Sequence, residues 1–222
     1  MDLPSHVKDK PGVSEDVLKL CDHLNSIGVR SRVIDKDGAE AIHHHVPPVF
    51  NNPLKAGRTG VVLVESRNVE YVELIKLMYS NPEHNRSNMP PVQWIYKYVY
   101  ALRADVKGKE KAIEATSRPI IRSPSASEVY LKSIEWDGAE LAGRLRSDEV
   151  LRGLMMSTRL VDIHVEGIGK DAYVAIVKEG TDKYEFMGLS VKIGCGDFPS
   201  PQEFEVYDRI AGHVKSMVPR SS

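Results

Sequence analysis

Apolar residues recur at helical spacing in two stretches of the first half of the chain. Ser14 stands before the first stretch and Gly28 after it, where an N-cap and a left-handed C-terminal residue would lie. Asn68 stands before the second stretch, which carries apolar residues at a spacing of three: Val69, Val72, Ile75 and Met78. We therefore predict helices from 14 to 28 and from 68 to 78.

The last helix of the chain has the most complete set of start signals. Ser200 is followed by Pro201 and Glu203, so an N-cap, a proline at the first helical position and a capping box coincide. Its apolar stripe comprises Phe204, Tyr207, Ile210, Val214 and Met217. Two shorter helices are expected. One follows Asp137, which stands three residues before Glu140 as in a capping box, and the other begins at Ser147–Glu149.

Strands are predicted where apolar residues alternate with polar ones or form short continuous runs. Aromatic residues recur at every second position in 92–106, and this strand is expected to pair with one within 111–122. The other predicted strands are 29–35, 61–64, 129–136, 160–166, 172–178 and 184–193. Short turns join the last three, so we expect an antiparallel meander covered by the C-terminal helix.

The order of these elements predicts an α/β to α+β fold. The N-terminal half, 1–122, is expected to be an α/β lobe with a mixed sheet and long loops at 39–60 and 80–91. The small polar segment 123–127 resembles a linker, and 123–222 is expected to hold the meander and the C-terminal helix. The boundary is soft, and one continuous domain is the alternative.

Composition restricts the function classes. The 222 residues carry a formal charge of -1, so no global field favours nucleic acid or an anionic membrane. No apolar run reaches the length of a bilayer crossing, and the N-terminus lacks the order of a secretory signal. Two distant cysteines do not make a disulfide framework, so a cytoplasmic protein is expected.

Five residues are the candidate ligands of a divalent metal. Asp162, His164 and Glu166 would share one face of the strand 160–166, because side chains alternate along a strand. His43 and His45 would project together from the first long loop. A solvated sheet face and a surface loop with incidental histidines are the simpler interpretations, because no familiar ligand spacing is present.

Two segments are candidates for anion binding. Lys55 and Arg58 belong to a Gly-containing stretch that precedes a strand, whereas phosphate loops follow one, so a strand-entry turn is the simpler interpretation. The segment 94–111 combines aromatic residues with a cationic cluster, and core packing is the simpler role of its aromatics. The candidate anion-binding residues in that cluster are Lys107, Lys109 and Lys111.

Cys195, in the Gly-flanked turn before the C-terminal helix, is the one candidate nucleophile, although a structural thiol suits such a turn better. No set of nucleophile, base and orienting group is visible. We therefore predict a non-catalytic protein that binds a ligand, a protein partner or a second copy of itself. The alternatives are a metal-dependent hydrolase or nuclease using the five metal candidates, and an anion or nucleic-acid binder using 94–111.

Overall fold

The computed structural model describes residues 14–34, 55–80, 92–125, 128–168, 173–178, 183–186, 189–191 and 198–218. The chain divides into two compact units that alternate along the sequence. The first unit comprises residues 1–66, 71–98 and 182–198, and the second comprises 67–70, 99–181 and 199–222. Among the described helices, none combines the length and the apolar character that a membrane crossing requires.

In its described residues, the first unit packs helix α1 on an antiparallel sheet. Its strands follow the order β1, β2, β3, β4, β9 and β10. Its elements are α1 (Glu15–Ser26), β1 (Ser31–Val33), β2 (Lys55–Val64), β3 (Tyr71–Ser80), the start of β4 (Val92–Arg103), β9 (Lys183–Phe186) and β10 (Leu189–Val191).

Helix α1 forms where it was predicted. Ser14 is its N-cap and accepts a hydrogen bond from the Asp16 N–H, and Gly28 follows the helix with φ 82°. Four apolar side chains of the helix are buried: Val17, Leu20, Cys21 and Leu24. Gly60 of β2 lies directly beneath Val17, since a Cβ at Gly60 would stand 3.2 Å from the Val17 methyl groups.

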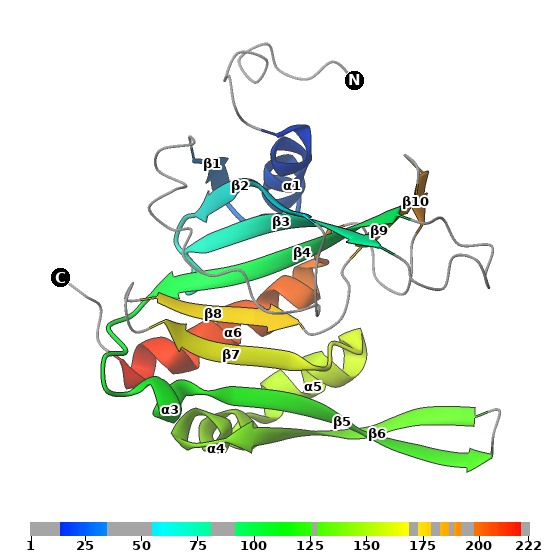
Figure 1. Ribbon diagram of the computed structural model, residues 1–222. Coiled ribbons are helices and arrows are strands. Elements are labelled where there is room, and N and C mark those ends of the chain that lie inside the picture. The colour runs from blue at the N-terminus through cyan, green and yellow to red at the C-terminus, as the bar shows by residue number, and fades with distance from the viewer. Residues whose placement is uncertain are drawn as a thin grey trace. The chain divides into compact units, whose positions relative to one another are not determined.

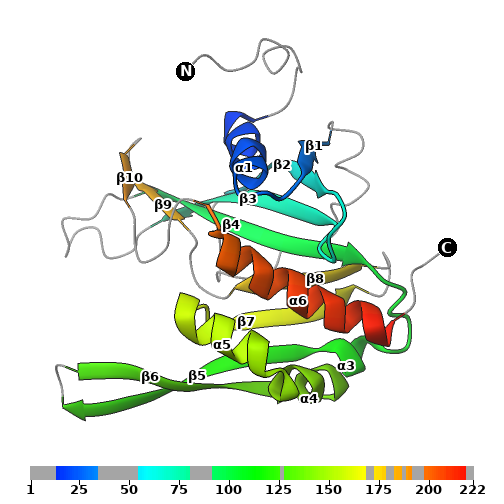
Figure 2. The ribbon, with the colours of Figure 1, turned by 180° about the vertical axis from the view of Figure 1, so that it is seen from behind.

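The second unit has its helices on one face of an antiparallel sheet (Figure 2). Its strands follow the order β4, β8, β7, β5 and β6. In addition to the end of β4, it contains α3 (Glu110–Ile113), β5 (Ala115–Ser125), β6 (Glu128–Gly138), α4 (Glu140–Ser147), α5 (Glu149–Thr158), β7 (Ile163–Ile168), β8 (Tyr173–Lys178) and α6 (Pro201–Met217). Figure 1 shows this sheet from the opposite side.

Helix α6 begins as predicted. Ser200 accepts the Glu203 N–H, and the Glu203 carboxylate accepts the Ser200 N–H, so the capping box is complete. Four members of its apolar stripe are buried and Met217 is half-buried, and Tyr207 stacks on Tyr100 of β4 with ring centroids 3.7 Å apart. Burial of such large side chains against the sheet makes α6 a main source of the second unit's hydrophobic stabilisation.

One carboxylate within the buried stripe of α6 anchors the segment that leads into β3. Asp208, only 6% exposed, accepts the backbone N–H groups of Asn68 at 2.6 Å and Val69 at 2.9 Å. Its second oxygen accepts the Asn68 side-chain amide. The carboxylate therefore does for this segment what a neighbouring strand would otherwise do, which is to satisfy its backbone donors.

The mixed class of helices and strands is confirmed, including the C-terminal helix, while several individual elements differ from the prediction. The expected helix 68–78 is wrong, because β3 occupies Tyr71–Ser80, and residues 55–60 of the expected first loop belong to β2. β4 pairs with β8 and β9 rather than with β5, and β9, expected beside β8, pairs with β10 and β4. The boundary expected at 122 lies inside β5.

Candidate functional site

The structure places two of the predicted metal ligands together. β7 starts at Ile163, and Asp162 precedes it with φ 57°, so the strand alternation that was expected to align Asp162 does not include it. His164 Nε2 lies 3.8 Å from a carboxylate oxygen of Glu166, and His164 Nδ1 lies 2.9 Å from the Thr116 hydroxyl. Within the described part of the chain, no three metal-competent side chains gather.

The remaining metal candidates and the candidate nucleophile, His43, His45 and Cys195, lie outside the described residues. The hydrolase or nuclease alternative therefore stays a prediction. In the described ranges, His164 contacts both the Thr116 hydroxyl and Glu166, and the side chains of His164 and Glu166 are partly exposed.

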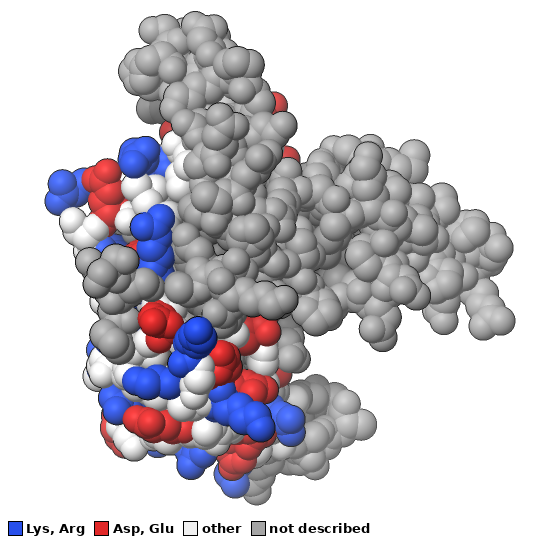
Figure 3. All heavy atoms as spheres, turned by 60° about the vertical axis from the view of Figure 1, so that its left-hand side comes forward, with Lys and Arg blue, Asp and Glu red and all other residues white. Residues whose placement is uncertain are grey.

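The aromatic and basic segment is divided between core and surface. Tyr98 and Tyr100 are 6% and 2% exposed, so neither offers a stacking platform to a base. Lys55 and Arg58 lie in β2, and the three other candidate anion ligands, Lys107, Lys109 and Lys111, are exposed in and after the turn that follows β4. On the described part of the face in Figure 3, acidic and basic side chains are intermixed.

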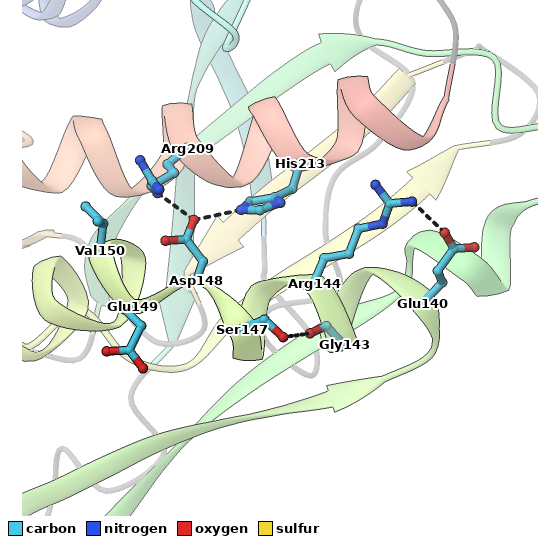
Figure 4. Close-up of a pocket in the computed structure, with 9 residues that line it drawn as sticks. All are labelled: Glu140, Gly143, Arg144, Ser147, Asp148, Glu149, Val150, Arg209 and His213. Atoms are coloured by element: carbon cyan, nitrogen blue, oxygen red, sulfur yellow. Dashed lines mark hydrogen bonds and ion pairs between the residues drawn. The ribbon is translucent and has the colours of Figure 1, made fainter.

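The strongest polar constellation of the second unit centres on Asp148, at the junction of α4 and α5 (Figure 4). The prediction that a helix begins at Ser147–Glu149 is confirmed, since Asp148 is the N-cap of α5 and accepts the Leu151 N–H at 3.0 Å. Its other oxygen accepts Arg209 Nε and lies 2.7 Å from His213 Nε2. Because Arg209 and His213 are one turn apart on α6, one carboxylate ties two helices together.

The environment of Asp148 keeps it ionised. Burial by itself would raise the carboxyl pKa, but hydrogen bonds from Arg209, the Leu151 N–H and His213 outweigh it, and the pKa lies well below its usual range. The Asp148 side chain is only 5% exposed, whereas Arg209 is 37% exposed. The free-energy cost of desolvation therefore falls mainly on the Asp148 carboxylate, and hydrogen bonds from three donors offset it.

A cavity of about 740 Å³ opens beside this carboxylate and is lined by Glu140, Gly143, Arg144, Ser147, Asp148, Glu149, Val150, Arg209 and His213. An Asp and His pair is part of several hydrolytic sites, so the hydroxyls near it matter. The Ser147 hydroxyl donates to the Gly143 carbonyl, and the Ser216 hydroxyl donates to the His213 carbonyl. Both hydroxyls thus donate to backbone carbonyls, and the hydrogen bonds of Asp148 to Arg209 and His213 clamp α5 to α6.

A second hollow lies at the base of a two-stranded arm formed by β5 and β6. β5 pairs with β7 only at Ala115 and Thr116, and from Ser117 onward its described ladder partner is β6 alone. The arm extends away from the rest of the second unit in Figures 1 and 2. Such two-stranded ribbons are marginally stable in water unless another surface covers them.

This hollow, which we call the arm groove, has a volume of about 510 Å³ and is lined by Pro119, Ile121, Leu131, Met156, Arg159, Val161 and Asp162. Five of these side chains are apolar, and Ile121 is 56% exposed. The arm contributes one wall, and the end of α5 with the segment before β7 contributes the other. The groove falls within the volume range of ordinary ligand pockets.

The two polar residues of the arm groove both have left-handed backbone conformations. Arg159 closes α5 with φ 55° and ψ 28°, a position that glycine usually occupies, and Asp162 has φ 57°. For a residue with a Cβ this conformation costs about 1 kcal/mol. None of the described residues forms an ion pair or side-chain hydrogen bond with the Arg159 guanidinium.

Comparisons of the chain with protein-family models, with curated proteins and with solved structures find no match. The function must therefore be argued from these two sites alone. Sequence reasoning identified neither of them: Arg209 and His213 carried a signal, since they are four residues apart on the predicted last helix, but their partner is 61 residues or more away. The arm groove gave no periodic signal.

Proposed function

We propose that the protein is a non-catalytic partner-binding protein, and that the arm groove is where the partner docks. The observation that carries the proposal is Ile121, a large aliphatic side chain left 56% exposed at the wall of an apolar hollow. Exposed apolar surface that adjoins a concave, mainly apolar lining is typical of interaction sites.

The construction of the arm supports docking through side chains rather than through a free strand edge. Pro119 provides no backbone donor on β5, and the ladder shifts between Ile120 and Ile121, where Lys132 of β6 has no opposite residue. Prolines, bulges and exposed charges on edge strands discourage the addition of a further strand. The exposed face of the arm is therefore available without making the arm prone to edge-to-edge aggregation.

The Asp148 clamp supports the same proposal from the other side of α5. It fixes α5 to α6, and the C-terminal end of α5 supplies Met156 and Arg159 to the groove. A binding wall held on a rigid helix loses little conformational entropy when a partner docks.

The proposal also places the protein in the cytoplasm, where the buried free thiol of Cys21 stays reduced.

The experiment is a selection of random displayed peptides on immobilised protein, with two matched variants. Ile121→Asp removes the docking side chain, while Val150→Asp places an aspartate at another strongly exposed apolar residue, 57% exposed and outside the groove. The wild type and Val150→Asp should enrich the same sequences. A bound peptide would bury the Ile121 side chain, and loss of such a contact costs about 2 kcal/mol of binding free energy. Ile121→Asp should therefore bind those peptides at least tenfold more weakly. Equal enrichment on all three proteins, or none on the wild type, would contradict the proposal.

A further inference from the structure

We infer that the arm groove takes a peptide segment that carries an acidic residue next to its apolar side chains, with the carboxylate paired to Arg159. This inference rests on the proposed docking function and adds the chemistry of the partner. Arg159 lines the groove, is exposed, and has no ion-pair or hydrogen-bond partner for its guanidinium among the described residues. A guanidinium without a partner at the rim of an apolar hollow is complementary to a carboxylate.

The backbone at Arg159 gives independent support for a role of its side chain. Glycine would fit the left-handed position that ends α5 without steric cost, whereas arginine adopts it with φ 55°. Strained backbone retained where a simpler residue would be more stable points toward function rather than toward folding. The neighbouring exposed cations do not share this feature: Arg144 and Arg152 lie within helices and pair with Glu140 and Glu149.

The same groove is unsuited to other occupants. A nucleic acid would need several cations along its phosphates, and the groove lining has one. A second copy of the chain docking groove to groove would bring the two copies of Arg159 into one interface, because a two-fold interface places the same patch on both sides. Asp162, which also lines the groove, already has an interaction within the chain, so it offers no free carboxylate to Arg159 of the second copy. Like charges at such an interface oppose association. A peptide with apolar and acidic side chains complements the five apolar side chains and Arg159, while Asp162 is already engaged within the chain.

The test repeats the peptide selection on Arg159→Glu, Arg159→Lys and Arg159→Gly, each checked for folding by circular dichroism. Peptides enriched on the wild type should contain Asp or Glu beside apolar residues. Arg159→Lys should keep that preference, Arg159→Gly should lose it, and Arg159→Glu should shift enrichment toward Lys and Arg. For one enriched peptide, exchange of its acidic residue for the amide should weaken binding to the wild type roughly threefold to tenfold and have no effect on Arg159→Gly.

The outcomes separate the two claims. Enriched peptides that need Ile121 but show the same composition on all Arg159 variants would overturn the acidic partner and leave the docking function standing. A wild-type dimer abolished by Ile121→Asp, seen by sedimentation at the assay concentration, would overturn the peptide partner in favour of a second copy. Absence of any Ile121-dependent binding would overturn the docking function itself. Support requires both the Ile121 dependence and the charge reversal.

Discussion

Replacement of Asp148 tests the clamp between α5 and α6 quantitatively. In Asp148→Ala three interactions disappear: the cap of α5, the ion pair with Arg209 and the hydrogen bond with His213. The cap is worth about 1 kcal/mol. The ion pair is worth about 1 kcal/mol, because more than a third of the Arg209 side chain is exposed and screened by water. The histidine hydrogen bond adds about 1 kcal/mol.

We therefore expect Asp148→Ala to lower the free energy of unfolding by about 3 kcal/mol, a large share of the stability of an ordinary domain. Asp148→Asn keeps an oxygen that can accept the Leu151 N–H, so it should cost about 2 kcal/mol. The assay is urea unfolding followed by circular dichroism. Glu149→Gln is the matched control, since Glu149 is adjacent, 80% exposed and paired only with Arg152 in the described structure, and it should change the value by less than about 0.5 kcal/mol.

The pH dependence of the same difference provides a second check. The pKa of Asp148 is lowered in the folded state, so its contribution is complete above the unfolded pKa of about 4 and disappears as the pH falls toward the folded value. The gap between wild type and Asp148→Asn should thus be constant above about pH 5 and shrink in acid. A gap that widens in acid, or an Asp148→Ala no less stable than the control, would refute the clamp.

Two other buried groups give further predictions. Asp208→Ala leaves the backbone donors of Asn68 and Val69 without their acceptor and should cost about 3 kcal/mol, with faster hydrogen exchange at both amides; unchanged exchange would contradict the anchor. Burial raises the pKa of the Cys21 thiol, which is 8% exposed, so native protein should alkylate there roughly a hundredfold more slowly than protein in urea, as mass spectrometry of the Cys21 peptide would show. Equal rates would contradict its burial.

The helices that could be predicted are those whose start is determined by neighbouring residues. Ser14, Asp148 and Ser200 each satisfy a donor two or three residues further along, so the cap and its partner lie within the same short stretch of sequence. The spacing of apolar residues adds to this signal, because each of these helices buries one stripe against a sheet. Such local agreement makes these elements accessible without knowledge of the fold.

The predicted helix at 68–78 is wrong because the apolar spacing and the polar Asn68, which suggested a helix, arise from a buried strand and from a distant hydrogen bond. Every residue from Tyr71 to Ile75 is buried, so this part of β3 is covered on both faces and its apolar residues show no strand alternation. Asn68 resembled a helix cap, but its amide groups donate to Asp208. A side chain 140 residues away supplies the acceptor, and no local pattern contains that information.

The capping box expected at Asp137 failed for a similar reason. Asp137 is part of β6 and pairs with Arg118 across the arm, and α4 begins at Glu140 without a side-chain cap. The candidate site was beyond reach altogether: the arm groove combines residues from β5, β6, α5 and the segment before β7, which only the folded chain brings together. Of its two polar members, Asp162 was considered only as a metal ligand, and Arg159 is recognisable only through its backbone conformation.

The anchor at Asp208 also has a consequence for the order in which the chain folds. The second unit combines residues 67–70 with 99–181 and 199–222, and the bonds from Asn68 to Asp208 span 140 residues. Contacts so distant in sequence form late, since a long loop must close before they contribute. We therefore expect the entry into β3 to lack its acceptor during synthesis until α6 has emerged, and the apolar sheet face that α6 covers to stay exposed until then.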